Sequence, residues 1–308
     1  MLLLAVFFLG YIVSRRNAVS ESAKPRKFGA TYMTMNNPYF QDMNAQIEEI
    51  IEANGDFLIY RDPAQDQEKQ NEQIMDMLEE GITALFLNPV NWETVEPALV
   101  ACKEAGVSVF VIDTNVYNDE YVAFSILSDN YDAGVQCAED MMRKRSSARI
   151  VIIDSPGTKS IDDRVQGFLD TIAGNEAYET VYWLHGKGEL EVSMDEMDVL
   201  LSEAGPQFDV VLGGNDPSAL GALAALQMNQ MQEGILIYGI DGSPDGKVMI
   251  KEGYMEGSSA QQPLKIAQEA LAMAYDYLDG KEVEKLVIVP VTMITRDNID
   301  EFDIAGWQ

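Results

Sequence analysis

Short apolar runs alternate with amphipathic stretches along the chain from Lys27 onward. Each short run has the length of a buried strand, and the stretches between them repeat their apolar positions every three or four residues, as helices do. This alternation is typical of a parallel sheet whose strands are joined by helices. It occurs in two series, the second of which begins at Arg149. The pattern therefore predicts an α/β protein with two doubly wound halves.

The predicted strands of the first series are 28–34, 57–60, 84–87, 108–112 and 121–126. Those of the second series are 149–153, 178–183, 208–213, 235–240 and 255–258, and a last strand follows at 286–294. The predicted helices are 37–53, 65–80, 93–105, 129–144, 162–173, 193–203, 217–229 and 263–279. Pro38 in a first turn and Asp129 as an N-cap support two of the helix starts.

Amide and carboxylate side chains follow the ends of several predicted strands. They are Asn36, Asn37, Asn88, Asp113, Asn115, Asn215, Asp216 and Asp241. One such residue is usually a helix cap or a turn former. Ligands of open parallel sheets, however, bind beyond the carboxyl ends of the strands, and amide and carboxylate groups can pair with the vicinal hydroxyls of a sugar. These strand ends are therefore the candidate binding site.

The charge balance excludes one class of function. The chain has 21 Lys and Arg against 51 Asp and Glu, a formal net charge of −30. A nucleic-acid-binding protein needs a cationic face, so we exclude this class. Residues 1–27 carry five basic residues against Glu21 alone, a balance of +4, which leaves −34 for the remainder. Solvated faces explain this acidity, and we infer no cationic ligand from it.

Cysteine and histidine are too scarce for several kinds of site. The chain has one histidine, His185, and two cysteines, Cys102 and Cys137. These numbers exclude zinc-finger ligand sets and histidine-rich metal centres. The chain also lacks the G-x-S-x-G turn that a serine nucleophile would use. Both cysteines lie in helical patterns and are predicted to be free buried thiols. We therefore predict no metal site, no cofactor and no catalytic residue.

The N-terminus carries a membrane signal. Residues 2–13 form an apolar run of 12 residues that is followed by Arg15 and Arg16. As a helix it would span roughly 18 Å, which is short of the ~30 Å hydrocarbon core. It has the length of a signal-peptide core but no basic residue precedes it. We predict an uncleaved anchor on an extracytoplasmic protein; a signal cleaved near residues 18–20 and a segment of the globular body are the alternatives. Residues 14–27 are polar and basic and are predicted to form a linker.

A series of motifs resembles one family of receptors. Residues 34–40 (TMNNPYF) resemble the first strand-to-helix turn of the ribose-binding proteins, the periplasmic sugar receptors of ABC importers. Blocks that are similar to this family recur in order at 127–130, 163–168, 215–216, 239–246 and 260–263, and 289–298 resembles the related glucose/galactose receptors. The resemblance covers roughly residues 28–300, and its specificity comes from the whole set of blocks.

The resemblance implies two lobes that close on a ligand by a hinge motion. The crossings between the lobes are expected near Ser128, Gln261 and Pro290. The expected lobes are an N-terminal one of residues 28–128 plus 262–289 and a C-terminal one of residues 129–261 plus 290–308, after the anchor and linker of residues 1–27. The ligand contacts that the resemblance implies are Asn37, Tyr39, Phe40, Asp113, Arg164, Asn215, Asp241 and Gln261.

The residue types suit a sugar. Aromatic faces pack on the C–H face of a sugar ring, carboxylates accept strong hydrogen bonds from hydroxyls, and an arginine donates to two oxygens from a rigid fork. Two features depart from the family. Thr114 stands where ribose-binding proteins carry a second arginine, and residues 186–190 contain no aromatic ring where the family usually has one. Trp183 and His185 lie several residues too early to replace it, so we expect a pocket that is more open on one side.

The expected function is that of a monomeric binding protein that delivers a small neutral sugar or polyol to an ABC permease. The alternative is a tethered sugar sensor that signals to a histidine kinase or chemoreceptor, which the anchor favours. Asp113 and Asp241 are also enough in number for the two catalytic carboxylates of a glycosidase, but a sugar receptor uses the same pair to bind its ligand. Sugar-responsive repressors need a DNA-binding domain of ~60 residues before the first strand, and only 27 residues precede Phe28.

Overall fold

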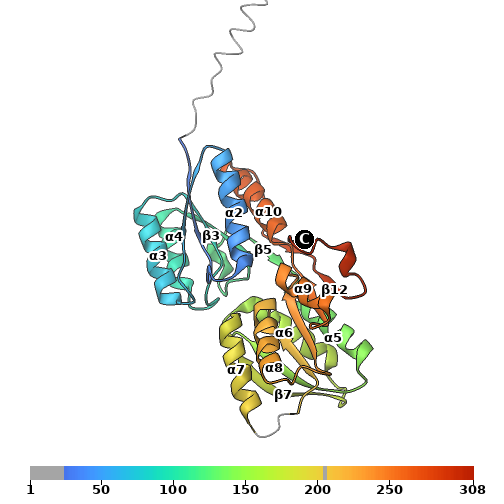
Figure 1. Ribbon diagram of the computed structural model, residues 1–308. Coiled ribbons are helices and arrows are strands. Elements are labelled where there is room, and N and C mark those ends of the chain that lie inside the picture. Colours follow the sequence, from blue (N-terminus) through green and yellow to red (C-terminus); the bar gives the residue numbers. More distant parts are fainter. Residues whose placement is uncertain (1–23, 204–206) are drawn as a thin grey trace, which may run out of the picture.

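The computed structural model describes residues 24–203 and 207–308 (Figure 1). The apolar run of residues 2–13 and most of the predicted linker lie outside the described residues. Within the described ranges, no helix is both long enough and apolar enough to cross a membrane. The described chain forms two lobes, each built on one six-stranded sheet.

The sheet of the first lobe is parallel throughout, with the strand order β11-β5-β4-β3-β1-β2. Its strands are β1 (Lys27–Thr31), β2 (Phe57–Arg61), β3 (Ala84–Leu87), β4 (Ser108–Asp113), β5 (Phe124–Ser128) and β11 (Leu286–Val289). Its helices are α2 (Pro38–Ala53) and α10 (Pro263–Leu278) on one face and α3 (Gln67–Glu79) and α4 (Glu96–Ala105) on the other. Apolar clusters fill both faces of the sheet, which explains why its strands are continuous apolar runs.

The second sheet repeats this arrangement in the order β12-β10-β9-β8-β6-β7. Its strands are β6 (Ala148–Asp154), β7 (Tyr178–His185), β8 (Val210–Gly213), β9 (Leu236–Asp241), β10 (Gly257–Ala260) and the antiparallel β12 (Thr292–Thr295). Its helices are α5 (Asn130–Lys144) and α6 (Lys159–Ile172) on one face and α7 (Leu190–Ser202), α8 (Asp216–Met228) and α9 (Pro244–Glu252) on the other. Two short 3-10 helices, η1 (Asp119–Tyr121) and η2 (Ile299–Glu301), complete the described elements. The prediction of two doubly wound α/β lobes is confirmed.

The carboxyl ends of equivalent strands carry the same type of residue in the two sheets. In each sheet the first strand of the series lies between the second and the third, which creates a crevice at the point where the strand order reverses. β4 and β9 occupy the same place in the two orders, and they end in Asp113 and Asp241. The carboxyl ends of both sheets thus present a carboxylate toward the space between the lobes.

The chain passes between the lobes three times. It crosses after Ser128, across Gln261 and at Pro290, where the crossings were expected. One prediction was wrong here, because the single strand expected at 286–294 is two strands in different sheets. Pro290 has no N–H to donate to a sheet ladder, so the pairing stops there. The strand expected at 121–126 also begins later, at Phe124, because Asp119–Tyr121 is a 3-10 turn.

Candidate functional site

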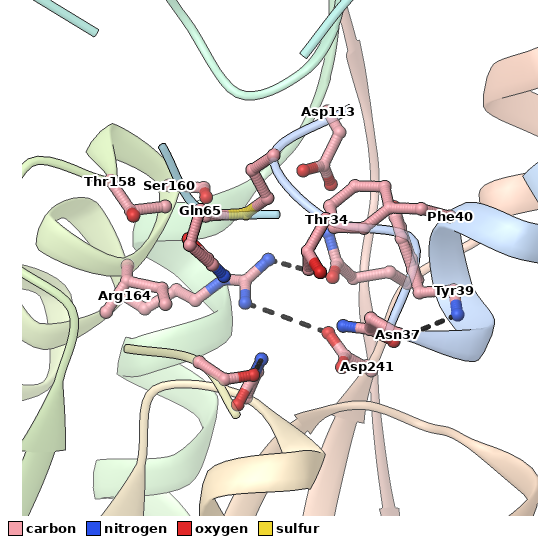
Figure 2. Close-up of a pocket in the computed structure, with 15 residues that line it drawn as sticks. Thr34, Asn37, Tyr39, Phe40, Gln65, Asp113, Thr158, Ser160, Arg164 and Asp241 are labelled. Atoms are coloured by element: carbon pink, nitrogen blue, oxygen red, sulfur yellow. Dashed lines mark hydrogen bonds and ion pairs between the residues drawn. The ribbon is translucent and has the colours of Figure 1, made fainter. Parts of the chain in front are cut away.

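A narrow cavity lies between the two lobes, and together with the open solvent at its mouth it has about 380 Å³ of space between atoms. All eight residues that the sequence singled out line this cavity, and six of them are labelled in Figure 2. The lining residues that the sequence reasoning missed are Met33, Thr34, Gln65, Thr158, Ser160, Ile161 and Gly188. Met33, Thr34, Gln65 and Gly188 lie in loops after strands, whereas Thr158 is the N-cap of α6 and Ser160 and Ile161 lie in its first turn. Their place after a strand end is the only signal that could have singled them out.

The first lobe contributes the start of α2. Asn37 is the N-cap of this helix, and its Oδ1 accepts a hydrogen bond from the backbone N–H of Tyr39 at 2.9 Å. The cap turns Tyr39 and Phe40 into the lobe, where both are buried and their rings meet edge to face with centroids 5.3 Å apart. The cap uses one of the two lone pairs of Oδ1, so the amide N–H₂ and one acceptor site of Asn37 are left for a ligand.

Asp113 is held in an unusual backbone conformation at the end of β4. Its φ is +70°, a strained value for a residue with a side chain. Asn88 donates from Nδ2 to Oδ2 of Asp113 at 3.0 Å. Oδ1 of Asp113 and the hydroxyl of Tyr39 are both buried and make no hydrogen bond of regular geometry among the described residues, but the two side chains lie close enough for the Tyr39 hydroxyl to oppose the rise in the pKa of Asp113. Asn88 therefore supports Asp113 from behind and does not line the cavity. Its position at a strand end had made it a candidate for the binding site.

Asp241 ends β9 in a similar way, with φ +140°. Behind it, the Asp216 carboxylate accepts hydrogen bonds from the backbone N–H and the hydroxyl of Ser243, both at 2.7 Å, and from the hydroxyl of Ser258 at 2.6 Å. These bonds fix the loop that follows Asp241. Asp216, predicted among the strand-end candidates, is thus a buried support that does not line the cavity.

Burial controls the ionisation of these carboxylates. It raises the pKa of Asp113 above its usual value and raises the pKa of Asp241 well above it, because the charged form loses its hydration. The Arg164 guanidinium opposes both shifts. Burial also raises the pKa of Tyr39, so the Tyr39 hydroxyl stays protonated and can donate a hydrogen bond.

Arg164, on α6, is the only cationic side chain that lines the cavity within the described chain. Its Nε donates to Oδ1 of Asn130 at 2.8 Å, Nη1 to the carbonyl of Gly214 at 2.9 Å, and Nη2 to Oε1 of Gln261 at 2.8 Å. Nη1 also lies 3.7 Å from Oδ1 of Asp241 (Figure 2). A guanidinium has five N–H groups, so one hydrogen on each terminal nitrogen is left for a ligand oxygen.

Two amide side chains, those of Gln261 and Asn215, are the remaining predicted residues that line the cavity. Gln261 donates from Nε2 to the Ser128 hydroxyl at 2.7 Å, which ties two of the interlobe crossings together beside Arg164. Asn215 is the N-cap of α8; its Oδ1 accepts from the N–H of Ser218 and its Nδ2 donates to the carbonyl of Gly188, both at 2.9 Å. Each group of Asn215 therefore has one hydrogen-bonding site left.

No aromatic ring from residues 183–190 lines the cavity. Trp183 and His185 do not line the cavity; Trp183 is exposed, and Nδ1 of His185 pairs with Oδ1 of Asp154 at 2.6 Å. Gly188 lines the cavity instead. A second hollow adjoins the cavity and shares Thr34, Asn37, Gly188 and Asp241 with it. No residue of this segment therefore supplies the missing ring.

The lobes touch across the mouth of the cleft. The N–H of Ser160 donates to the hydroxyl of Thr114 at 2.9 Å, so the residue that replaces the second arginine makes a contact between the lobes. The N–H of Trp92 donates to the carbonyl of Gly157 at 3.1 Å. A Cβ built on Gly157 would lie 3.9 Å from Cβ of Asn91. The structure is therefore a closed arrangement of the two lobes.

The cavity suits a neutral polyhydroxyl ligand. Its charged lining residues are Asp113, Asp241 and Arg164, which offer both acceptors and donors with little net charge. Among residues 24–203 and 207–308, no group of three or more His, Cys, Asp and Glu side chains is placed to hold a metal ion. The site has the composition of a binding pocket.

A cleft between two doubly wound lobes, joined by three crossings and lined by hydrogen-bonding side chains from both, defines a hinged solute-binding protein. Residues 28–282 match the family model of the periplasmic binding protein domain, and the chain belongs to this family. Membership of this family implies an extracytoplasmic location.

Relatives of known function agree with this assignment. The chain is 28% identical over 281 residues to the ribose import binding protein of Bacillus subtilis, covering 90% of each chain. It is 25% identical over 299 residues to the xylitol-binding protein of Mycolicibacterium smegmatis, covering 95% of this chain and 83% of that protein. The solute-binding protein of Bacillus halodurans with bound myo-inositol has the same fold, with a TM-score of 0.84 at 20% identity over 92% of this chain and 98% of that one. These relatives are binding proteins, as predicted, rather than enzymes.

Proposed function

We propose that this protein captures a small neutral sugar or polyol outside the cytoplasm, closes around it, and delivers it to an ABC importer. The observation that carries the proposal is that Asp113, Asp241 and Arg164 line one cavity between the lobes, where the protein uses only three of the five guanidinium hydrogens. The relatives named for ribose import and xylitol binding support this ligand class. They also favour delivery to a transporter over the sensor alternative.

In this proposal the eight predicted residues contact the ligand in distinct ways. Asp113 and Asp241 accept from hydroxyls, Arg164 donates to ring or hydroxyl oxygens, and Tyr39 donates from its hydroxyl. Phe40 packs on the C–H face of the sugar. The amides of Asn37, Asn215 and Gln261 supply the remaining donors and acceptors. The lobes that close are residues 28–128 plus 262–289 and residues 129–261 plus 290–308.

A thermal-shift screen tests the ligand class. D-ribose, xylitol, myo-inositol, L-arabinose, D-allose and glycerol are the compounds to compare. A ligand at about a hundred times its Kd stabilises the closed form by about 2.7 kcal/mol, which corresponds to a rise in Tm of roughly 4 °C for a protein of this size. D-ribose 5-phosphate is the matched control, because the buried carboxylates repel its charge. A screen in which no neutral compound raises Tm contradicts the proposal.

Ligand binding should release protons and weaken as the pH falls. Burial raises the pKa of Asp113 and Asp241, and hydroxyl donors of a ligand stabilise the charged carboxylates, so binding lowers both values. Affinity is therefore highest above the raised pKa of Asp241 and declines as the pH drops through it. Calorimetric titrations in two buffers of different ionisation enthalpy measure the protons released. An Asp241→Asn variant should bind weakly and release fewer protons, whereas equal proton release by both proteins contradicts this linkage.

We also propose that residues 2–13 tether the receptor to the membrane. The proposal rests on the apolar run and the basic residues that follow it. An anchored protein sediments with membranes and stays there after alkaline carbonate extraction. Recovery of a soluble form that begins near residue 20 would show that the segment is a cleaved signal.

A further inference from the structure

Residues 302–308, which follow η2, pack against the second lobe. Phe302 and Ile304 pack against the apolar cluster of that lobe. The ammonium group of Lys247, a fully buried residue of α9, donates hydrogen bonds to the backbone carbonyls of Asp303 and Gly306. A buried ammonium group that binds two carbonyls of one short segment fixes the path of that segment. Residues 302–308, called the strap below, therefore move with the second lobe.

The end of the strap contacts both walls of the cavity from outside. Nε2 of Gln308 donates to the carbonyl of Gly242 at 2.9 Å, next to Asp241 in the second lobe. Trp307 reaches the first lobe, where its ring meets the Tyr39 ring edge to face with centroids 5.5 Å apart and an interplanar angle of 87°. Nε1 of Trp307 donates to Oδ2 of Asp42 on α2 at 2.6 Å.

We propose that the strap stabilises the closed form and that Trp307 is a positioning residue for Tyr39. Trp307 does not line the cavity, but it packs on Tyr39, which does. The Tyr39 ring makes edge-to-face contacts with two other rings, those of Phe40 and Trp307. The geometry of a ligand-binding hydroxyl in the first lobe thus depends on a residue that the second lobe carries.

Through these contacts the strap affects the affinity of the protein for its ligand. Contacts between the lobes add to the stability of the closed form only, and apparent affinity is proportional to the population of the binding-competent form. An aromatic edge-to-face pair together with one hydrogen bond accounts for about a tenfold change in that population. The change falls mainly on the dissociation rate, as is usual for variants of one binding site.

Ligand kinetics test the proposal, and this arm rests on the proposed function. The probe is whichever of ribose, xylitol, myo-inositol, arabinose, allose and glycerol gives the largest thermal shift. Trp307→Ala should raise Kd about tenfold, mainly through faster dissociation. Trp307→Phe, which keeps a ring but loses the N–H donor, should give an intermediate value. The matched control Trp183→Ala, at an exposed position on β7, should leave Kd unchanged. Wild-type kinetics in both Trp307 variants overturn the proposal.

A second arm needs no sugar. The chain has three tryptophans, so Trp92→Phe with Trp183→Phe leaves Trp307 as the only one. In this background, Asn91→Cys and Gly157→Cys place two Cβ positions 3.9 Å apart across the cleft, within disulfide reach. Acrylamide should quench Trp307 less in the oxidised, closed protein than in the reduced one. Equal quenching in both states overturns the strap as a closure contact, whatever the protein binds.

Discussion

An Arg164→Lys variant should lose at least about a hundredfold in sugar affinity and still fold. The two guanidinium hydrogens that the protein leaves unused are the strongest donors in the cavity. A hydrogen bond to a charged group contributes about 1.5–3 kcal/mol, so losing two of them weakens binding by roughly 10²- to 10⁴-fold. Titration calorimetry with the best ligand of the thermal-shift screen measures the loss.

Lysine cannot replace arginine here because of its geometry. The guanidinium spans Asn130, Gly214 and Gln261 with three nitrogens at once, whereas an ammonium group is a point donor on a flexible stem. The variant also leaves buried acceptors unpaired, so we expect it to be less stable by about 1–3 kcal/mol. A binding loss must therefore be measured well below the lower Tm of the variant.

Arg143→Lys is the matched control for this substitution. Arg143 is exposed on α5, where it pairs with Asp140, and it is remote from the cavity lining. The control should bind like the wild type. If Arg164→Lys retains wild-type affinity, Arg164 is a structural residue between the interlobe crossings and the proposed donor role is wrong.

The sequence predicted the architecture well because each lobe follows local rules. Strands buried on both faces are short apolar runs, and helix caps such as Asn37 and Asp129 mark where helices begin. The grouping of the eight site residues also follows from topology, since the carboxyl ends of parallel strands meet at one edge. That they contact a ligand is still a prediction.

The remaining features depend on information that one sequence does not display. Asn88 and Asp216 have the same residue types and strand-end positions as the cavity residues, but their side chains turn away and support Asp113 and the loop after Asp241. The positive φ of Asp113 and Asp241 decides where those carboxylates point, and no local pattern predicts it. The contact between Trp307 and Tyr39 joins positions far apart in the chain, so only the folded structure shows it.

Cysteines at positions 91 and 157 should stop sugar exchange when they are oxidised. The two Cβ positions are 3.9 Å apart across the mouth of the cleft, close to the usual disulfide value of about 3.8 Å. Burial raises the pKa of Cys102 to about 12 and also raises that of Cys137, so neither natural thiol competes as a thiolate. Asn91 caps a turn through the N–H groups of Glu93 and Thr94, and Gly157 has a φ of +90°. The two single-cysteine variants therefore serve as controls for local strain.

The oxidised double variant tests whether the cleft is the route to the site. A sugar added after oxidation meets closed lobes, and its association should be at least about a hundredfold slower than in the reduced protein, because the open form that admits the sugar is depleted. A sugar bound before oxidation should be trapped, with dissociation slowed in the same way. Stopped-flow fluorescence with and without a reducing agent measures both rates. If the oxidised protein exchanges sugar at the reduced rate, the ligand enters by another path and hinge opening is not the gate.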